Sequence, residues 1–80
     1  METRSLSVIG SEIKKDWGLK ISPHAMPYLN AMLELDSIND TYYADSAKSV
    51  VLYFLSNATG WRGEVARRIK LELKRMCDVK

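Results

Sequence analysis

The stretch VVLYFL, residues 50–55, is the longest uninterrupted apolar run in the chain and decides the fold. Ala44 and Ala47 continue its pattern upstream, and it ends downstream in the sequence NATG, residues 57–60. Its branched and aromatic residues also suit a buried strand. The continuity with the two alanines favours a helix from about residue 43 to residue 58, and a helix that is apolar on every side is expected to be covered on every side.

Apolar residues at spacings of three and four predict another helix near the start of the chain. Its apolar face is formed by Leu6, Ile9, Ile13 and Trp17. Ser5 or Ser7 can cap the first turn, because a serine hydroxyl accepts a hydrogen bond from a free backbone N–H group there. Gly18 supplies the left-handed stop that commonly follows a helix.

Two prolines give the next helix two alternative starting points. Ser22 followed by Pro23 is a capping residue with proline in the favoured first helical position. Pro27 disfavours helical geometry at Met26, so the alternative is a start at Pro27 after a short turn. Apolar residues between 28 and 35 then form a broad face, and residues 36–40 are typical of a turn.

A basic amphipathic helix is predicted from about Trp61 to Cys77. Its apolar face is formed by Trp61, Val65, Ala66, Ile69, Leu73 and Met76. No segment is a convincing strand, and there is no repeat or linker. We therefore expect an all-α fold over residues 1–80, a compact single-domain bundle of about four helices in which the third helix is central and buried.

Length and composition exclude several classes of protein. Eighty residues allow one domain with a thin core, and 46% hydrophobic residues argue against disorder. No apolar run approaches the roughly 20 residues that span a membrane, and the first residues do not resemble a signal peptide. Cys77 is the only cysteine, which excludes an internal disulfide. We expect a cytoplasmic protein without membrane contact.

The inventory of reactive groups argues against an enzyme. His24 is the only histidine and has no acid or nucleophile at helical spacing, although general acid–base catalysis needs an orienting partner. Cys77 has no base beside it, and residues 60–63 do not form a phosphate-binding loop. The acids between residues 34 and 45 lack the spacing of a calcium loop. We expect no catalytic residue, cofactor or metal, and we infer no small-molecule substrate.

Charge is unevenly distributed, although the net charge is only +2. Residues 61–80 hold seven basic and three acidic side chains, whereas residues 1–60 hold five basic and seven acidic ones. The candidate contact residues for a partner lie in this basic segment: Arg62, Arg67, Arg68, Lys70, Leu71 and Lys74. The alternative is that they form an ordinary solvated helix face.

Within the last helix, the projected positions separate two arcs. One carries Arg67, Lys70 and Lys74 without an acid. The neighbouring arc is predicted to form a ladder of ion pairs along the helix, made of Glu64, Arg68, Glu72 and Arg75. Leu71 is expected to point away from the core.

Three further residues attract attention. Arg62 projects among the core positions, which predicts either a snorkelling side chain or an ion pair with a buried acid such as Asp45. Tyr42 and Tyr43 are adjacent, and we expect one to pack inward and the other to be exposed.

These features lead to two hypotheses about function. The first is a non-catalytic protein-interaction or regulatory module that uses the last helix, with a protein partner or self-association as a homodimer. The alternative is a nucleic-acid-binding module built on a helix-turn-helix-like pair around Gly60, in which arginines of the last helix face the groove or the phosphates. The second hypothesis predicts binding that weakens steeply with salt.

Overall fold

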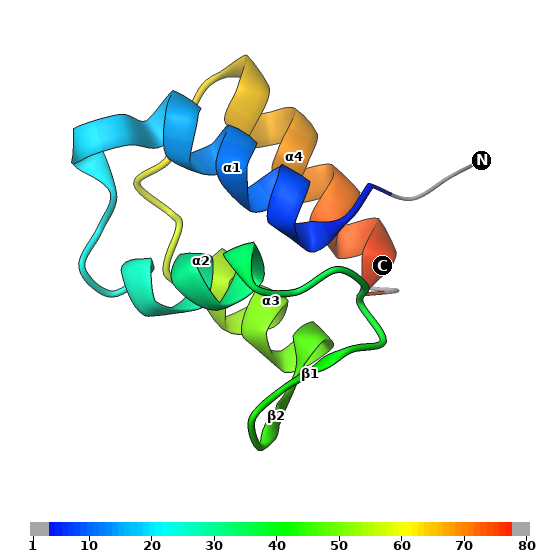
Figure 1. The fold of residues 1–80 in the computed structure, drawn as a ribbon. Helices are drawn as coiled ribbons and strands as arrows, with labels where there is room; N and C mark the ends of the chain where they lie inside the picture. Colours follow the sequence, from blue (N-terminus) through cyan, green and yellow to red (C-terminus); the bar gives the residue numbers. More distant parts are fainter. Residues whose placement is uncertain (1–3, 78–80) are drawn as a thin grey trace.

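The computed structural model describes residues 4–77, and helices make up most of this part of the chain (Figure 1). The helices are α1 (Leu6–Trp17), α2 (Met26–Leu33), α3 (Ala47–Ser56) and α4 (Glu64–Met76). A short 3-10 helix, η1 (Gly18–Lys20), follows α1, and two strands, β1 (Thr41–Tyr42) and β2 (Asp45–Ser46), precede α3. The predicted helical class is confirmed, but the two-stranded sheet means that the fold is not strictly all-α.

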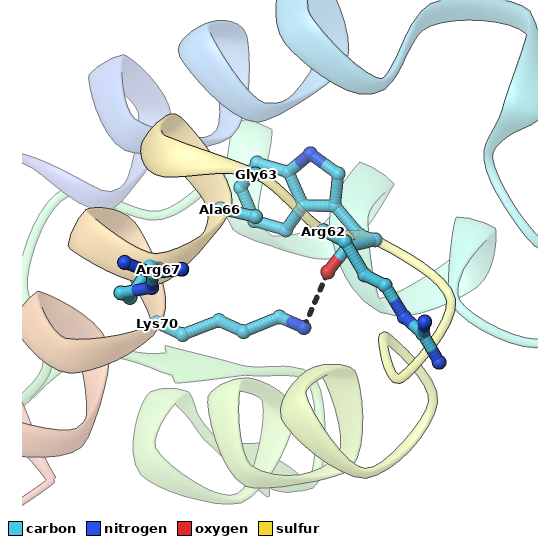
Figure 2. Close-up of a pocket in the computed structure, with 6 residues that line it drawn as sticks. Arg62, Gly63, Ala66, Arg67 and Lys70 are labelled. Atoms are coloured by element: carbon cyan, nitrogen blue, oxygen red, sulfur yellow. Dashed lines mark hydrogen bonds between the residues drawn. The ribbon is translucent and has the colours of Figure 1, made fainter.

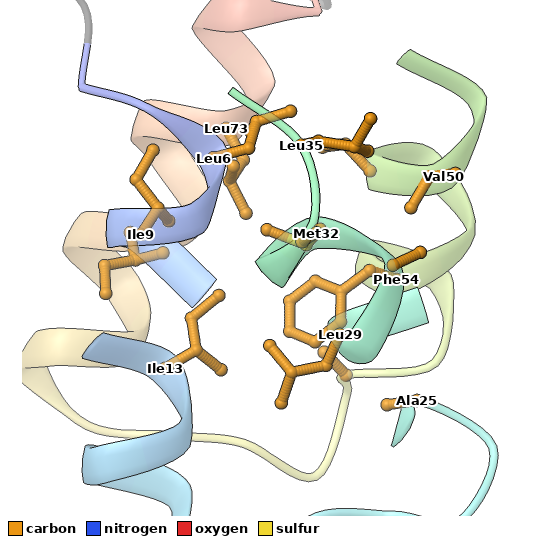
Figure 3. Close-up of a cluster of buried hydrophobic side chains, with 14 of the residues drawn as sticks. Leu6, Ile9, Ile13, Ala25, Leu29, Met32, Leu35, Val50, Phe54 and Leu73 are labelled. Carbon is orange, nitrogen blue, oxygen red and sulfur yellow. The ribbon is translucent and has the colours of Figure 1, made fainter. Parts of the chain in front are cut away.

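The helices close a ring around one apolar core. α1 packs against α2 and α4, and α3 also packs against α2 and α4. Figure 3 shows the centre of the core, where side chains from all four helices meet, among them Leu6, Ile9, Ile13, Leu29, Met32, Phe54 and Leu73. α3 is therefore one side of the ring and not its centre. Tyr53 on its outer side is 53% exposed, so the expectation of a third helix covered all round is wrong.

The ends of α1 follow the sequence pattern closely. The Ser5 hydroxyl accepts a hydrogen bond from the backbone N–H of Val8 at 3.2 Å, which makes Ser5 the cap. Gly18 has φ +62°, and its N–H donates to the carbonyl of Lys14. The stop predicted at this glycine is confirmed, and its positive φ is disfavoured for a residue with a side chain, but its ψ of −133° lies outside the left-handed helical region.

α2 begins between its two predicted starting points. The carbonyl of Ser22 accepts hydrogen bonds from the N–H groups of Ala25 and Met26, both at 3.0 Å, so Ser22 and Pro23 form a turn before the helix. Pro27 then lies in the first turn of α2, where its missing N–H group has no intrahelical partner to lose.

α3 begins at Ala47, four residues later than expected, because the preceding residues form a hairpin. Thr41 pairs with Ser46 and Tyr42 with Asp45 in antiparallel register. The Ser46 hydroxyl accepts from the N–H of Ser49 at 3.1 Å and caps α3. The expectation of no strand is wrong, because the helical pattern of alanines and valines continues upstream of Ser46, whose side chain caps the first turn of α3.

α4 begins at Glu64 and not at Trp61. Gly63 has φ +114°, which ends the preceding loop in a conformation that favours glycine. The connection from α3 to α4 covers residues 57–63, longer than the three- or four-residue turn of a helix-turn-helix. The prediction of a helix-turn-helix-like pair around Gly60 is therefore wrong about the length of the turn.

The core makes a specific prediction about two neighbouring residues of α3. Phe54 is fully buried, so Phe54→Ala should lower the free energy of unfolding by about 3–5 kcal/mol. Tyr53 is the matched control, because it is next in the chain and half exposed. Tyr53→Ala should lose about 1 kcal/mol, mainly its stacking with Tyr28. Urea denaturation followed by circular dichroism measures both, and equal losses would contradict the placement of α3.

Candidate functional site

The loop before α4 is held by the indole of Trp61. This side chain is 2% exposed and stacks on Trp17 at the end of α1, with ring centroids 5.7 Å apart. Its Nε1 donates a hydrogen bond to the Asp16 carboxylate at 2.9 Å. Trp61 thus belongs to the core as predicted, but from a loop and not from a helix. The next residue, Arg62, is consequently held at the surface.

Lys70 fixes the same loop from α4. Its Nζ donates to the backbone carbonyls of Ala58 at 2.7 Å and Trp61 at 2.6 Å, and it lies 5.9 Å from the centre of the Trp61 ring. Partial burial lowers the pKa of Lys70, and the positive charges of Lys74 and Arg62 lower it further. At least two of the three ammonium donors are therefore used inside the chain.

An open pocket of about 310 Å³ lies where this loop meets α4. Its wall is formed by Trp61, Arg62, Gly63, Ala66, Arg67 and Lys70, so three cations and no acid line it. Figure 2 shows the side chain of Lys70 extending between Arg62 and Arg67. Three cations around one hollow repel each other, and a bound anion would relieve that repulsion.

The paired acids near α4 lie on the side of this helix that is opposite the pocket. The guanidinium of Arg4 forms an ion pair with Glu12 of α1 at 2.7 Å and with Glu72 of α4 at 2.7 Å. Arg68 pairs with the other carboxylate oxygen of Glu12. The ion-pair ladder predicted along α4 is wrong, because the planar fork of Arg4 binds both oxygens of Glu72, a geometry that successive helix turns do not offer.

This pairing leaves a surface that we call the basic face, composed of Lys48, Arg62, Arg67, Lys70 and Lys74. α3 contributes no acid, and of the two acids in α4 Glu72 is already paired. Within residues 4–77, Arg62, Arg67 and Lys74 form no ion pair. The acid that remains nearby is Glu64, which lies one turn before Arg67.

The predicted contact residues separate into distinct environments. Arg67 and Lys74 are exposed on α4, and Leu71 is 51% exposed, as expected from its position. Arg68 is occupied by Glu12, and Lys70 by the loop carbonyls.

Arg62 differs most from its prediction. It lies in the loop before α4 and is exposed, so its projected place among the core positions is wrong. It forms no ion pair with Asp45 or with any other acid among the described residues. The projection failed because it assumed a helix that already began at Trp61.

Lys48 is the member of the basic face that the sequence pattern did not predict. The thiol of Cys77 lies 3.9 Å from the carbonyl of Lys48, and this contact brings the start of α3 beside the end of α4 that carries Lys74. Lys48 is 26 positions from Lys74 in the sequence. No local spacing connects the two residues, so only the packing of α3 on α4 shows them on one surface.

The thiol of Cys77, the only cysteine of the chain, is buried. Burial raises the pKa of the Cys77 thiol, which opposes formation of a nucleophilic thiolate. Among residues 4–77, no three His, Cys, Asp or Glu side chains gather as metal ligands. The helices in this range are also too short or too polar to cross a membrane.

Comparisons with protein-family models, curated proteins and solved structures find no match to this chain.

The ion pairs beside α4 predict a pH dependence of stability. Hydrogen bonds from Arg4 and then Arg68 lower the pKa of Glu12 in the folded protein. The stability that Glu12 contributes is therefore complete above about pH 4.3, its ordinary pKa, and is lost as the pH falls through the lowered value. Glu12→Gln should reduce the melting temperature at neutral pH and flatten its decline in acid. Glu34→Gln is the control, and identical acid profiles for both variants and the parent would contradict the network.

Proposed function

We propose that the protein is a non-catalytic module that binds nucleic acid through the phosphate backbone, with the basic face as its contact surface. The observation that supports this most directly is the sorting of charge around α4. Arg62, Arg67 and Lys74 have no acidic partner among residues 4–77, whereas the acids Glu12 and Glu72 are paired on the other side of the helix. A row of unneutralised cations is the electrostatic footprint expected for a polyanion.

The spacing of the cations fits a phosphate backbone. Arg67 and Lys74 are seven positions apart, which is about 10 Å along a helix axis at 1.5 Å per residue. Successive phosphates of one strand advance about 3.4 Å along a duplex, so the two side chains span about three steps. Arg62 and the pocket at the start of α4 extend this row by one more cation, and the planar guanidinium groups suit phosphate oxygens.

A duplex suits the basic face better than a single strand. Proteins that bind single strands stack bases on exposed aromatic rings beside their cations. Here the aromatic residue of the pocket, Trp61, is stacked inside the core on Trp17. The exposed tyrosines, Tyr43 and Tyr53, lie on the hairpin and on the side of α3 that faces Tyr28 of α2. Contacts to phosphates alone do not depend on base sequence.

Removing two cations should separate this proposal from a general effect of charge. We expect the double variant Arg67→Ala, Lys74→Ala to lose most of its affinity for a short mixed-sequence DNA duplex, measured by fluorescence anisotropy. The matched control is Lys14→Ala, Lys15→Ala, which removes the same charge from exposed positions of α1 and should bind as the parent does. Equal weakening in both double variants, or no binding by the parent at low salt, would overturn the proposal.

The salt dependence tests how many phosphates are contacted. If Arg62, Arg67 and Lys74 each neutralise one phosphate, the slope of log K against log salt should be about −2.7. The parent should then lose roughly 40-fold in affinity between about 50 and 200 mM salt. The double variant Arg67→Ala, Lys74→Ala should retain a slope of about −0.9.

Glu64 offers a test in the opposite direction. Its carboxylate lies one turn from Arg67 and repels a phosphate bound there. Glu64→Gln should therefore tighten duplex binding by about 1.5- to 5-fold, the range that one exposed charge contributes. Asp36→Asn, near the hairpin, should leave the affinity unchanged. Thermal melts of both variants check that they are folded, because Glu64 also stabilises the first turn of α4.

A further inference from the structure

The hairpin before α3 holds one aromatic ring out in solvent. Tyr43 is 89% exposed and has φ +55°. Its ring packs edge-on against Tyr42, with centroids 4.7 Å apart, and the Tyr42 hydroxyl donates to the Glu34 carboxylate at 3.1 Å. As expected, one tyrosine of the pair is partly covered and the other is exposed. The partly covered Tyr42 therefore holds the ring of the exposed Tyr43 in place.

Folding alone does not explain this arrangement. A bulky residue is disfavoured at positive φ, where glycine or asparagine is usual in a hairpin. An exposed aromatic ring also gains little from the hydrophobic effect. Strained residues of this kind concentrate at binding sites, where the surrounding structure holds them in place. Tyr43 therefore has the character of a contact residue.

The charge around Tyr43 defines the chemistry of its partner. Residues 21–47 contain no lysine or arginine, and they contain four acids: Glu34, Asp36, Asp40 and Asp45. All except Asp40 are exposed. This end of the molecule repels nucleic acid and attracts a cationic surface that offers an apolar contact for the ring.

Leu71 on α4 has the complementary surroundings. It is 51% exposed, and its neighbours on a helix surface are the residues three and four positions away on each side. All four of these residues are cationic: Arg67, Arg68, Lys74 and Arg75. Tyr43 thus belongs to a segment whose charged side chains are acids, and Leu71 lies among cations, of which Arg68 is paired with Glu12.

We propose that Tyr43 of one copy docks on Leu71 of a second copy, with the acids of the hairpin facing the cations around Leu71. Figure 1 shows the hairpin on the side of the molecule opposite α1, and its strands pack against α3. The two contact surfaces differ, and such an interface adds copies head to tail. The contact is small and charged, so it dissociates on dilution and in salt.

This self-association does not require nucleic-acid binding, but it shares two cations with the basic face, Arg67 and Lys74. A duplex on the basic face and a second copy on Leu71 therefore exclude each other. The experiment below contains no nucleic acid, so its failure would leave the duplex proposal intact, and a failure of duplex binding would leave the association intact.

Sedimentation velocity of the pure chain at low salt, over a rising concentration series, tests the contact. We expect the average mass to rise beyond that of a dimer and to return to a monomer in high salt. Tyr43→Gly and Leu71→Glu should each remain monomeric. Both should stay folded, because glycine adopts positive φ freely and Leu71 is exposed on the helix. Val8→Glu is the matched control, since Val8 is exposed to the same extent on α1 and should associate as the parent does.

A mixture of the two variants gives the decisive result. Tyr43→Gly keeps the Leu71 surface and Leu71→Glu keeps the Tyr43 surface, so an equal mixture retains one working contact. We expect the mixture to form dimers and nothing larger. A monomeric parent at every concentration, association of either variant alone, or a mixture that stays monomeric would overturn the proposal.

Discussion

The indole of Trp61 connects three parts of the molecule that are far apart in the sequence. Its ring stacks on Trp17 at the end of α1 and its Nε1 donates to Asp16, while the backbone carbonyl of Trp61 accepts from Lys70 of α4. Separating this stacked pair is costly, because both rings are buried and the hydrogen bond from the Trp61 indole to Asp16 would be broken. The loop before α4 therefore keeps one position, and the direction of α4 and the place of Arg62 depend on it.

A second constraint sorts the charges once α4 is in place. Arg4 draws Glu12 and Glu72 together between α1 and α4, and Arg68 joins them. An acid that is paired between α1 and α4 cannot neutralise a cation on the other side of α4, so that other side is basic. In the segment that forms α2 and the hairpin, the charged side chains are all acidic, and His24 is its one histidine. A chain with a net charge of +2 thus folds into a molecule with one strongly basic face and one acidic end.

The sequence predicted the elements whose signals are local. The spacing of apolar residues and two capping residues were enough for α1, because Ser5 and Gly18 act within one turn of their own helix. The same periodicity extended α3 and α4 too far toward the N-terminus, because it does not register that Ser46 ends a hairpin or that Gly63 turns the chain.

The candidate site could be predicted only in part, for a related reason. The exposed cations of α4 follow from helix geometry, so Arg67, Lys74 and the exposed Leu71 were expected. The pairing of Arg4 with Glu72 joins residues 68 positions apart, and Lys48 reaches the basic face through the packing of α3 on α4. No local pattern contains such contacts, although they decide which cations keep their charge unneutralised.

The stacked indoles also give the molecule an optical property. Trp17 and Trp61 are the only tryptophans of the chain, and they lie in one cluster with Phe54. Ultraviolet emission excited at the indole band therefore comes from a single location, where the first helix meets the loop before the last. Opening of that junction changes the fluorescence of both tryptophans together. The natural chain therefore reports, without an added label, whether α1 and the loop that carries Arg62 are in contact.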